Sequence, residues 1–307
     1  MTIRRFLQPH SRNELTAALA EMTADSKVIA GGTDLMLEIR DRDPEIPVLV
    51  SLCKVPELKG ICVTETAAGQ ELHIGAMECH ADIAASETVR KYPSALAESC
   101  DHVGSRQVRN RGTIGGSLGN ASVAGDMLPV LYLFHASLAV TGPDGTDRMI
   151  PVEELPAGIG RTSLAFNEII KEIVIPVHPE RSSCFVKLGG REEVTIAEIS
   201  LSLSWEMRDG KIAAVEGVMG AVDRVPAVLT EADGILGQGT VGTEECERLF
   251  GCLSERIAVI RKNRKRPPKL RIREGEKEFK ERAVRGVVYD AVGKMLAKAG
   301  MTGPAGA

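Results

Sequence analysis

Residues 112–126 constrain the fold more than any other stretch, because five of these residues are glycines, at positions 112, 115, 116, 119 and 125. Between them lie Thr113, Ser117, Asn120 and Ser122, which are small and able to form hydrogen bonds. Glycine lets a backbone adopt positive φ angles and approach a ligand closely. Consecutive N–H groups in such a turn form a concavity that binds anions. The stretch therefore predicts a loop around a phosphate group, although glycine alone also fits a tight surface turn.

A second glycine-rich turn lies about eighty residues upstream, at residues 30–34 (Ala-Gly-Gly-Thr-Asp). It follows a short segment, Lys27 to Ala30, that we predict to be a buried strand. Thr33 is expected to cap a helix that runs to about Arg40. The N-terminus of that helix would point unpaired N–H groups at whatever the glycines hold, which favours an anion. Two such turns in one chain predict two sides of one cofactor site.

Taken together, these motifs resemble the flavin-binding subunit of the molybdenum hydroxylases, the family of the xanthine dehydrogenase and carbon monoxide dehydrogenase medium subunits. The resemblance rests on the first turn, on residues 113–116 (Thr-Ile-Gly-Gly), on residues 120–122 (Asn-Ala-Ser) and on Asp126, and it extends over nearly the whole chain. It implies an oxidoreductase subunit within a hetero-oligomer. Such a subunit binds FAD and passes electrons from a [2Fe–2S] partner subunit to an acceptor, commonly NAD, while substrate is hydroxylated at the molybdopterin of a large partner subunit.

The resemblance also implies a set of FAD contacts. Val103 would flank the isoalloxazine, Ile170 would contact the flavin, and Asp126 and Lys187 fall on a family acid and a family lysine. Thr195 stands where the family often has Asp, so no acid role is carried over there. The implied cofactor-binding residues are Val28, Ile29, Ala30, Gly31, Gly32, Thr33, Asp34, Leu35, Val103, Thr113, Ile114, Gly115, Gly116, Ser117, Asn120, Asp126, Ile170 and Lys187.

The expected fold is α+β, with a two-part N-terminal α/β FAD-binding region of the PCMH type and a C-terminal domain of small antiparallel sheet plus helices. We predict domains at residues 1–55, 56–178 and 179–307. In the last domain, residues 199–208 and 212–219 alternate around an Asp-Gly turn, which is typical of a hairpin. Predicted elements elsewhere are strands at 48–52, 61–64, 71–75, 138–141 and 169–177 and helices at 80–85, 93–101, 127–134, 230–236, 243–260 and 277–299.

Composition excludes several other classes. The chain has 307 residues and a net charge of −4, and no apolar run approaches the ~20 residues that span a bilayer. The N-terminus lacks the hydrophobic stretch of a signal peptide, so a cytoplasmic location is expected. Seven cysteines occur without any C-x-x-C spacing, which gives no support for a zinc or iron–sulfur site in this chain.

Residues 115–119 also match G-x-S-x-G, the nucleophile elbow of hydrolases. In chain order, Asp144 and His178 would complete a triad with Ser117. The motif needs a buried strand before the serine and a helix after it, whereas polar residues precede it and a glycine-rich stretch follows. Acyl transfer is therefore the minor alternative, and a non-redox nucleotide-binding module is the other.

Eight Lys or Arg residues fall within residues 261–273. Nucleic-acid binding is one interpretation of such a run. Two consecutive prolines, the lack of aromatic residues and the acidic balance of the whole chain favour a solvated linker or a contact with an acidic partner subunit instead. We expect no contact with nucleic acid or membrane.

Overall fold

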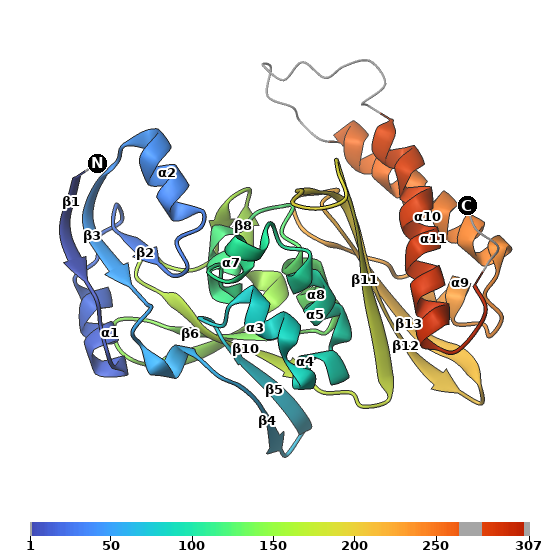
Figure 1. Ribbon diagram of the computed structural model, residues 1–307, viewed down its shortest axis with the longest axis horizontal. Coiled ribbons are helices and arrows are strands. Elements are labelled where there is room, and N and C mark those ends of the chain that lie inside the picture. The colour runs from blue at the N-terminus through green and yellow to red at the C-terminus, as the bar shows by residue number, and fades with distance from the viewer. Residues whose placement is uncertain (1, 264–277, 304–307) are drawn as a thin grey trace. The chain divides into compact units, whose positions relative to one another are not determined.

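The computed structural model describes residues 2–263 and 278–303 (Figure 1). These residues form two compact units, and the chain passes back and forth between them. Unit 1 comprises Met1–Lys91, Val103–Ser122 and Phe134–Val177, and unit 2 comprises Tyr92–His102, Val123–Leu133 and His178–Ala307. The α+β prediction is confirmed. The contiguous domain ranges 1–55, 56–178 and 179–307 stay predictions, since the compact units follow a discontinuous division.

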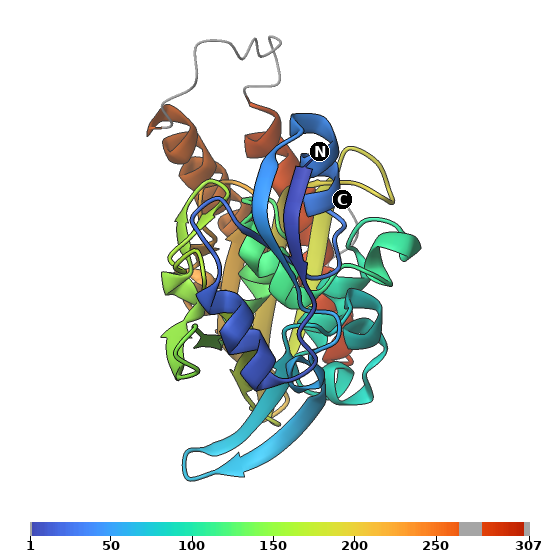
Figure 2. The same ribbon diagram turned by 90° about the vertical axis from the view of Figure 1, so that its left-hand side faces the viewer.

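Unit 1 begins with a parallel three-stranded sheet in the order β1-β3-β2 (Figures 1 and 2). Its elements are β1 (Thr2–Leu7), α1 (Arg12–Ala20), β2 (Lys27–Ile29), α2 (Leu35–Arg42) and β3 (Glu45–Ser51). Ser11 caps α1, because its side chain accepts a hydrogen bond from the N–H of Glu14. Leu15 and Leu19 of α1 are almost fully buried and pack with Val50 of β3. The buried side of α1 thus packs against this sheet.

The rest of unit 1 is built on an antiparallel sheet in the order β4-β5-β10-β6-β7. Its strands are β4 (Ile61–Thr66), β5 (Gly69–Gly75), β6 (Ser137–Thr141), β7 (Asp147–Pro151) and β10 (Ile169–Pro176). The central strand β10 is apolar and mostly buried, whereas the β4–β5 hairpin projects from the sheet (Figure 2).

Short elements complete unit 1: η1 (Pro56–Leu58), α3 (His80–Ala85), α4 (Glu87–Lys91), α6 (Arg106–Arg109), α7 (Ile114–Asn120), η2 (Val152–Glu154), β8 (Pro156–Gly158) and β9 (Arg161–Thr162). The sequence predicted α3 but not α4, α6 or the β8–β9 pair.

Unit 2 has an antiparallel sheet in the order β11-β12-β13-β14, with helices on both faces. Its elements are α5 (Ser94–Asp101), α8 (Met127–Leu133), β11 (Arg181–Gly189), β12 (Ala197–Arg208), β13 (Lys211–Gly220), β14 (Ala227–Val228), α9 (Ala232–Leu236), α10 (Thr243–Asn263) and α11 (Phe279–Lys298). Glu98 of α5 accepts a hydrogen bond from the N–H of Phe185 and pairs with Lys294 and Lys298 of α11, which ties α5 to this unit.

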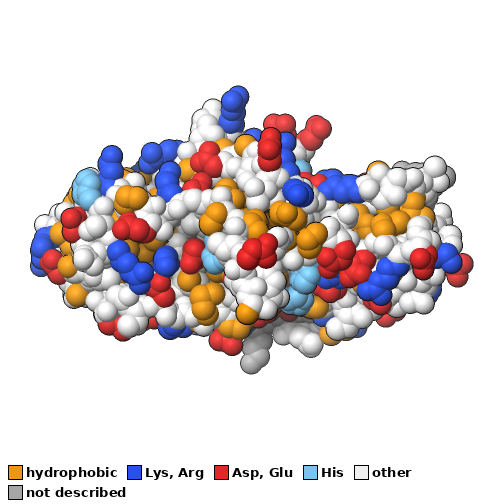
Figure 3. Space-filling view, turned by 90° about the horizontal axis from the view of Figure 1, so that it is seen from below, with side chains coloured by type: hydrophobic (Ala, Val, Ile, Leu, Met, Phe, Trp, Pro, Cys, Tyr) orange, Lys and Arg blue, Asp and Glu red, His pale blue; other side chains and the backbone are white. Residues whose placement is uncertain are grey.

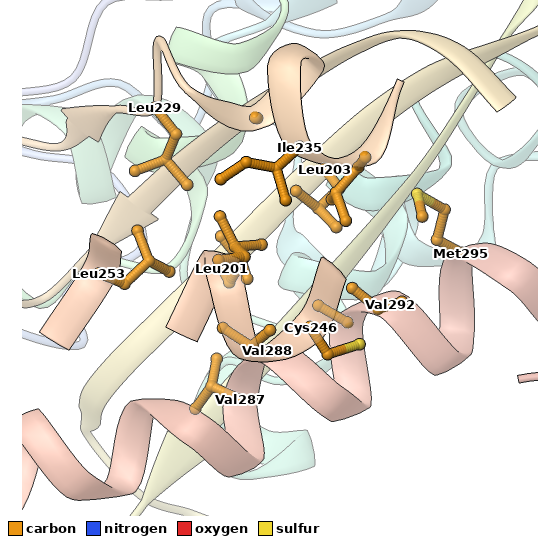
Figure 4. Packing of buried hydrophobic residues seen from close by; sticks show 14 of the residues in the cluster. Leu201, Leu203, Leu229, Ile235, Cys246, Leu253, Val287, Val288, Val292 and Met295 are labelled. Atoms are coloured by element: carbon orange, nitrogen blue, oxygen red, sulfur yellow. The ribbon is translucent and has the colours of Figure 1, made fainter. Parts of the chain in front are cut away.

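One face of this sheet carries the larger core (Figure 4). Leu201 and Leu203 of β12 point at Cys246 of α10 and at Val288 and Val292 of α11, and all five are fully buried. Burying one such aliphatic side chain contributes about 1.5–3 kcal/mol. The apolar stripe of α10 faces this core, because Cys246 belongs to it together with the buried Leu249, Leu253 and Ile257 and the partly buried Phe250.

None of the helices in the described part of the chain combines the length and apolar composition that crossing a membrane requires. The cytoplasmic location stays a prediction. Nor do the described residues bring three or more His, Cys, Asp or Glu side chains into a group that fits a metal ion.

Acidic and basic side chains are intermixed on the face shown in Figure 3. Such mixing gives no single-sign field of the kind that attracts nucleic acid. Of the basic stretch 261–273, residues 261–263 end α10, and the remainder lies outside the described residues.

Candidate functional site

The two glycine turns meet backbone to backbone in unit 1. A Cβ on Gly31 would lie 2.7 Å from the carbonyl carbon of Arg111 and closer still to its oxygen. A Cβ on Gly112 would lie 3.2 Å from the His80 ring and 3.4 Å from the Thr33 hydroxyl. Glycine is therefore required at position 31 because no side-chain atom fits there. The structure brings together the two turns that the sequence separates.

Residues 114–120 of the second glycine stretch form the helix α7, so the loop that we predicted there is wrong, and the contact of this stretch with the cofactor stays a prediction. Thr113 has an extended backbone and its hydroxyl caps α7 by accepting from the N–H of Gly116. Ile114 and Leu118 are buried one turn apart and hold the helix in place. The N–H groups of Ile114 and Gly115 donate to the carbonyls of Glu78 and Ala76. These two donors are therefore already used within the chain.

Gly115 and Gly116 of α7 serve close packing, whereas a Cβ on Gly119 would meet nothing within 4 Å. None of the glycines at positions 112, 115, 116 and 119 adopts a positive φ. A Cβ on Gly115 would lie 2.6 Å from the Cβ of Ala76, and one on Gly116 would lie 2.9 Å from the Thr113 hydroxyl. Both distances are too short for a real side chain, so α7 lies against its neighbours at a separation that only glycine allows.

The first glycine turn, in contrast, keeps free donors. Gly32 has φ +78°, and among the described residues no acceptor is found for the backbone N–H groups from Gly31 to Leu35. Asp34 rather than Thr33 is the N-cap of α2, and its side chain caps no N–H, which corrects our expectation. An open helix N-terminus and a run of free N–H groups together favour an anion.

These segments enclose a cavity of about 490 Å³, within the size range of small-molecule sites. Its walls all belong to unit 1. The predicted residues that line it are Val28, Ala30, Gly31, Gly32, Thr33, Asp34, Leu35, Val103, Thr113, Gly115, Gly116, Ser117, Asn120 and Ile170. Ile29 and Ile114 are not among the lining residues; Ile114 is fully buried, and the Ile29 side chain lies near Gly32.

The charges around this cavity are largely balanced. Lys27 is the sole Lys or Arg among the described lining residues, and its ammonium lies 4.0 Å from Glu38. Glu168 accepts two hydrogen bonds of 2.8 Å from Arg148, and this guanidinium holds the pKa of Glu168 below its ordinary value. An anion would therefore be bound chiefly by backbone N–H groups, not by a cluster of cations.

His80 lies at the bottom of the site and was not predicted. It is 3% exposed, and its backbone N–H donates to the carbonyl of Gly112. Burial lowers the pKa of its imidazole to about 4, and the positive charge of Arg109 adds to the effect. Its Nδ1 has no hydrogen-bond partner among the described residues. A neutral ring thus lies under the glycine turns.

Asp126 and Lys187 belong to unit 2, where they form a buried ion pair. The Lys187 ammonium lies 2.7 Å from one carboxylate oxygen and also donates to the carbonyl of His102. Burial raises the pKa of Asp126 above its ordinary value, and the attraction of Lys187 counteracts only part of this. The second oxygen of Asp126 has no partner among the described residues. The role of this pair toward the cofactor stays a prediction.

Residues 2–178 match the family model of the FAD binding domain in molybdopterin dehydrogenase. The chain belongs to this family. The resemblance predicted from the two glycine turns is thereby confirmed, and with it the assignment to the flavin-binding subunits of molybdenum hydroxylases and to the oxidoreductases.

Relatives of the family have similar sequences over most of the chain. The nicotinate dehydrogenase FAD-subunit of Eubacterium barkeri is 31% identical over 237 residues, which are 75% of this chain and 78% of the relative. The nicotine 6-hydroxylase medium subunit of Paenarthrobacter nicotinovorans is 31% identical over 249 residues, or 79% and 83%. A chain of quinoline 2-oxidoreductase from Pseudomonas putida 86 superposes with a TM-score of 0.82 at 23% identity, over 96% of this chain and 97% of that chain, and shares the fold.

The hydrolase alternative lacks its geometry. Ser117 lies inside α7, which begins three residues earlier at Ile114, whereas a nucleophile elbow places serine at a sharp turn between strand and helix. Asp144 accepts hydrogen bonds from Thr146 in an exposed turn, and His178 lies 3.4 Å from Glu180. Each is engaged locally, and the family assignment replaces this alternative.

The residues of the FAD-family site fit the cofactor on three observations. Free N–H groups at the first turn suit a pyrophosphate, close-packed glycines leave the floor open, and apolar residues such as Val103 and Ile170 suit planar rings. Thr33, Ser117 and Asn120 make no side-chain hydrogen bond among the described residues, so their polar groups are available to ribose or ribityl hydroxyls.

Sequence reasoning missed one wall of the cavity. This wall is the segment after β9, whose residues Thr162, Leu164, Ala165, Phe166 and Glu168 line the cavity. It comes from the chain about fifty residues after α7 and carries no motif. Only the pairing of β10 with β5 and β6 brings it to the glycine turns.

Proposed function

We propose that this chain is the FAD-binding electron-transfer subunit of a molybdenum hydroxylase and that NAD is its electron acceptor. Its partners would be a [2Fe–2S] small subunit and a molybdopterin-binding large subunit, where the organic substrate is hydroxylated. The observation that carries the proposal is the run of free N–H groups from Gly31 to Leu35 at the edge of the cavity. When bound, FAD supplies the redox chemistry, and the protein supplies binding, orientation and electrostatics.

Different residues of the cavity would bind different parts of the cofactor. Backbone N–H groups from Gly31 to Leu35 would donate to the pyrophosphate, helped by the positive end of the α2 dipole. The exposed carboxylate of Asp34 would be repelled by phosphate, so it would accept from a cofactor hydroxyl instead. Val103 and Ile170 would contact the flavin, as the family resemblance implies.

The absence of a cationic cluster among the described lining residues supports a dinucleotide held by backbone dipoles. Glu38 and Glu168 each have a cationic neighbour, so neither opposes an anion with a free charge. His80 stays uncharged at neutral pH because burial lowers its pKa to about 4.

The absorbance spectrum of the purified chain is the first test. Flavin bands that persist through desalting, or that return when FAD is added to the flavin-free chain, are expected. A chain that binds other nucleotides but no flavin would favour the non-redox nucleotide-binding module. Such a result would remove the electron-transfer proposal.

Reconstitution tests the electron path. The FAD-loaded chain alone, the partner subunits alone and the mixture are each assayed for substrate-dependent reduction of NAD. We expect turnover only in the mixture, while the chain alone transfers electrons from reduced NAD to an artificial dye. Hydroxylation of an aldehyde or purine by the isolated chain would contradict the proposal. A mixture that reduces a dye but not NAD would contradict only the choice of acceptor.

A further inference from the structure

The wall that sequence reasoning missed ends in a tightly held turn. The N–H of Glu168 donates to the carbonyl of Ala165 at 3.0 Å, which makes Phe166 and Asn167 the central residues of the turn. The Glu168 carboxylate accepts from the N–H of Ala165 at 2.8 Å. Arg148 of β7 donates two hydrogen bonds to the same carboxylate. The backbone that carries Phe166 is thus fixed by backbone and side-chain bonds together.

Phe166 is an unusual residue for the centre of a turn. Turn centres favour Gly, Pro, Asn, Asp and Ser, each for its own conformational reason. Phe166 is instead a large aromatic that is 50% exposed, and it lines the cavity. Among the described lining residues it is the sole Phe, Tyr or Trp, in a chain where these make up 3% of residues.

The groups around Phe166 indicate what kind of ligand would contact its ring. The same cavity presents free N–H donors at Gly31 to Leu35 and apolar side chains at Leu164 and Ile170. A ligand that satisfies both carries an anionic part and a planar apolar part. An aromatic side chain held half-exposed gains most from stacking on a conjugated ring, because stacking removes the exposed ring face from water.

We propose that Phe166 stacks on a planar ring of the bound FAD and that the turn of residues 165–168 serves to present it. This inference rests on the proposed FAD-binding function and adds a positioning residue that contacts the cofactor by its ring face. The Arg148–Glu168 pair sets the turn, so it acts on the cofactor only through Phe166.

Dissociation constants for FAD test the proposal, measured from the change in flavin fluorescence on binding. Phe166→Ala should weaken FAD binding about fivefold or more, because stacking on an aromatic is worth about 1–3 kcal/mol. Phe166→Leu keeps an apolar side chain without a flat ring, so its dissociation constant for FAD should lie between those of the native chain and of Phe166→Ala. Phe6→Ala is the matched control, since Phe6 is 56% exposed in the same unit but does not line the cavity.

A tryptophan at the same position reports which ring is stacked. The single native tryptophan, Trp205, is fully buried in unit 2, so Phe166→Trp introduces a distinguishable exposed reporter. FAD should quench its fluorescence and bind about as tightly as to the native chain. Titration with ADP and with FMN separates the adenine from the isoalloxazine as the stacking partner.

The outcomes separate this inference from the function on which it rests. If the native chain binds no FAD, the proposed function fails and the stacking falls with it. If the native chain binds FAD but Phe166→Ala binds within twofold of it, with an unchanged melting temperature, the function stands and the stacking is wrong. Equal losses in Phe166→Ala and Phe6→Ala would also overturn it, because the effect would then be one of exposed aromatics in general.

Discussion

The glycine-turn region of unit 1, residues 30–35 and 112–120, differs from the helix-on-sheet core of unit 2 in what fills its interior. In the first region backbone lies directly against backbone, with glycines wherever a Cβ would collide. In the second, β12 presents Leu201, Leu203 and Trp205 to α10 and α11, and all three are fully buried in one cluster with residues of these helices. The first region borders a cavity, whereas the second is filled with buried side chains.

The polar groups of the two regions differ in the same way. The free N–H groups at Gly31 to Leu35 border a cavity, so a ligand can satisfy them. In unit 2, Ser202, Ser204 and the indole N–H of Trp205 also have no partner among the described residues, but each is fully enclosed. An unsatisfied donor indicates a binding site only where space for an acceptor lies beside it.

The largest effect is expected from Gly31→Ala. Its Cβ would overlap the carbonyl oxygen of Arg111, and backbone cannot rotate away as a side chain can. We expect a loss of about 3 kcal/mol or more in the free energy of unfolding, together with loss of FAD binding. Chemical denaturation and flavin titration measure the two. A variant with native stability and native affinity would show that the two turns do not need their close contact.

Lys187→Met probes the buried pair of unit 2. Removing one partner leaves Asp126 buried without its counter-charge, which costs about 3 kcal/mol. The double variant Asp126→Leu/Lys187→Met should recover most of the loss, since an apolar pair needs no compensation. A double variant whose loss of stability equals the sum of the two single losses would contradict this coupling.

The substitution Asp126→Asn tests the predicted role of the acid toward the cofactor. We expect a modest weakening of FAD binding, measured together with the same denaturation series.

His80 gives unit 1 a dependence on acid pH. Its pKa is about 4 in the folded chain, against 6.5 for an ordinary histidine. Between these values the unfolded chain binds a proton that the folded chain does not, so stability falls as pH drops from 6.5 to about 4. This loss of stability is absent above pH 6.5 and reaches about 3 kcal/mol near pH 4.

His80→Gln removes the titrating group but keeps a polar side chain. The difference in unfolding free energy between the native chain and this variant should therefore change across pH 4 to 6.5 and stay constant above it. A difference that is independent of pH over the whole range would show that the imidazole titrates normally.

The smallest effects on the free energy of unfolding are expected when a helical glycine is replaced by alanine, once in α10 and once in α7. Gly251 lies inside α10 of unit 2, where an added Cβ would meet nothing within 4 Å. Gly251→Ala should therefore stabilise unit 2 by about 0.5–1 kcal/mol through helix propensity. Gly115→Ala in α7 should destabilise instead, since its Cβ would lie 2.6 Å from that of Ala76. Thermal melts of both variants measure these changes. Melting temperatures that shift in the same direction in both variants would contradict the contrast between the two regions.

The behaviour of α7 shows where prediction from the sequence stops. Together with residues 30–34, the glycines at 112–126 identified the family. They also predicted a loop, which is wrong at residues 114–120 despite the low helix propensity of glycine. Burial of Ile114 and Leu118 and the Thr113 cap outweigh that propensity. A propensity is local, whereas the packing that overrides it comes from Ala76 and Glu78, distant in sequence.

The remaining wall of the site had no local signal at all. Thr162 to Glu168 contain neither glycine nor a recognisable motif, and Phe166 becomes informative only when its exposure and the cavity are known. His80 is similar, because a lone histidine in a helix is more often structural. The predicted C-terminal hairpin and the long helices were found because their periodicity is itself local. The sequence did not predict the strand β11, nor that α5 and α8 belong to unit 2.

The discontinuous path of the chain has a consequence for its synthesis. Helices α5 and α8 leave the ribosome well before β11, β12 and β13, the strands on which they pack. At 5–20 residues per second, Leu96 and Val130 stay without their final partners for several seconds or more. The nascent chain must carry these apolar surfaces until its last third emerges. Ribosome-bound chains stopped near residue 178 should therefore engage chaperones, and release of the full chain should end that engagement.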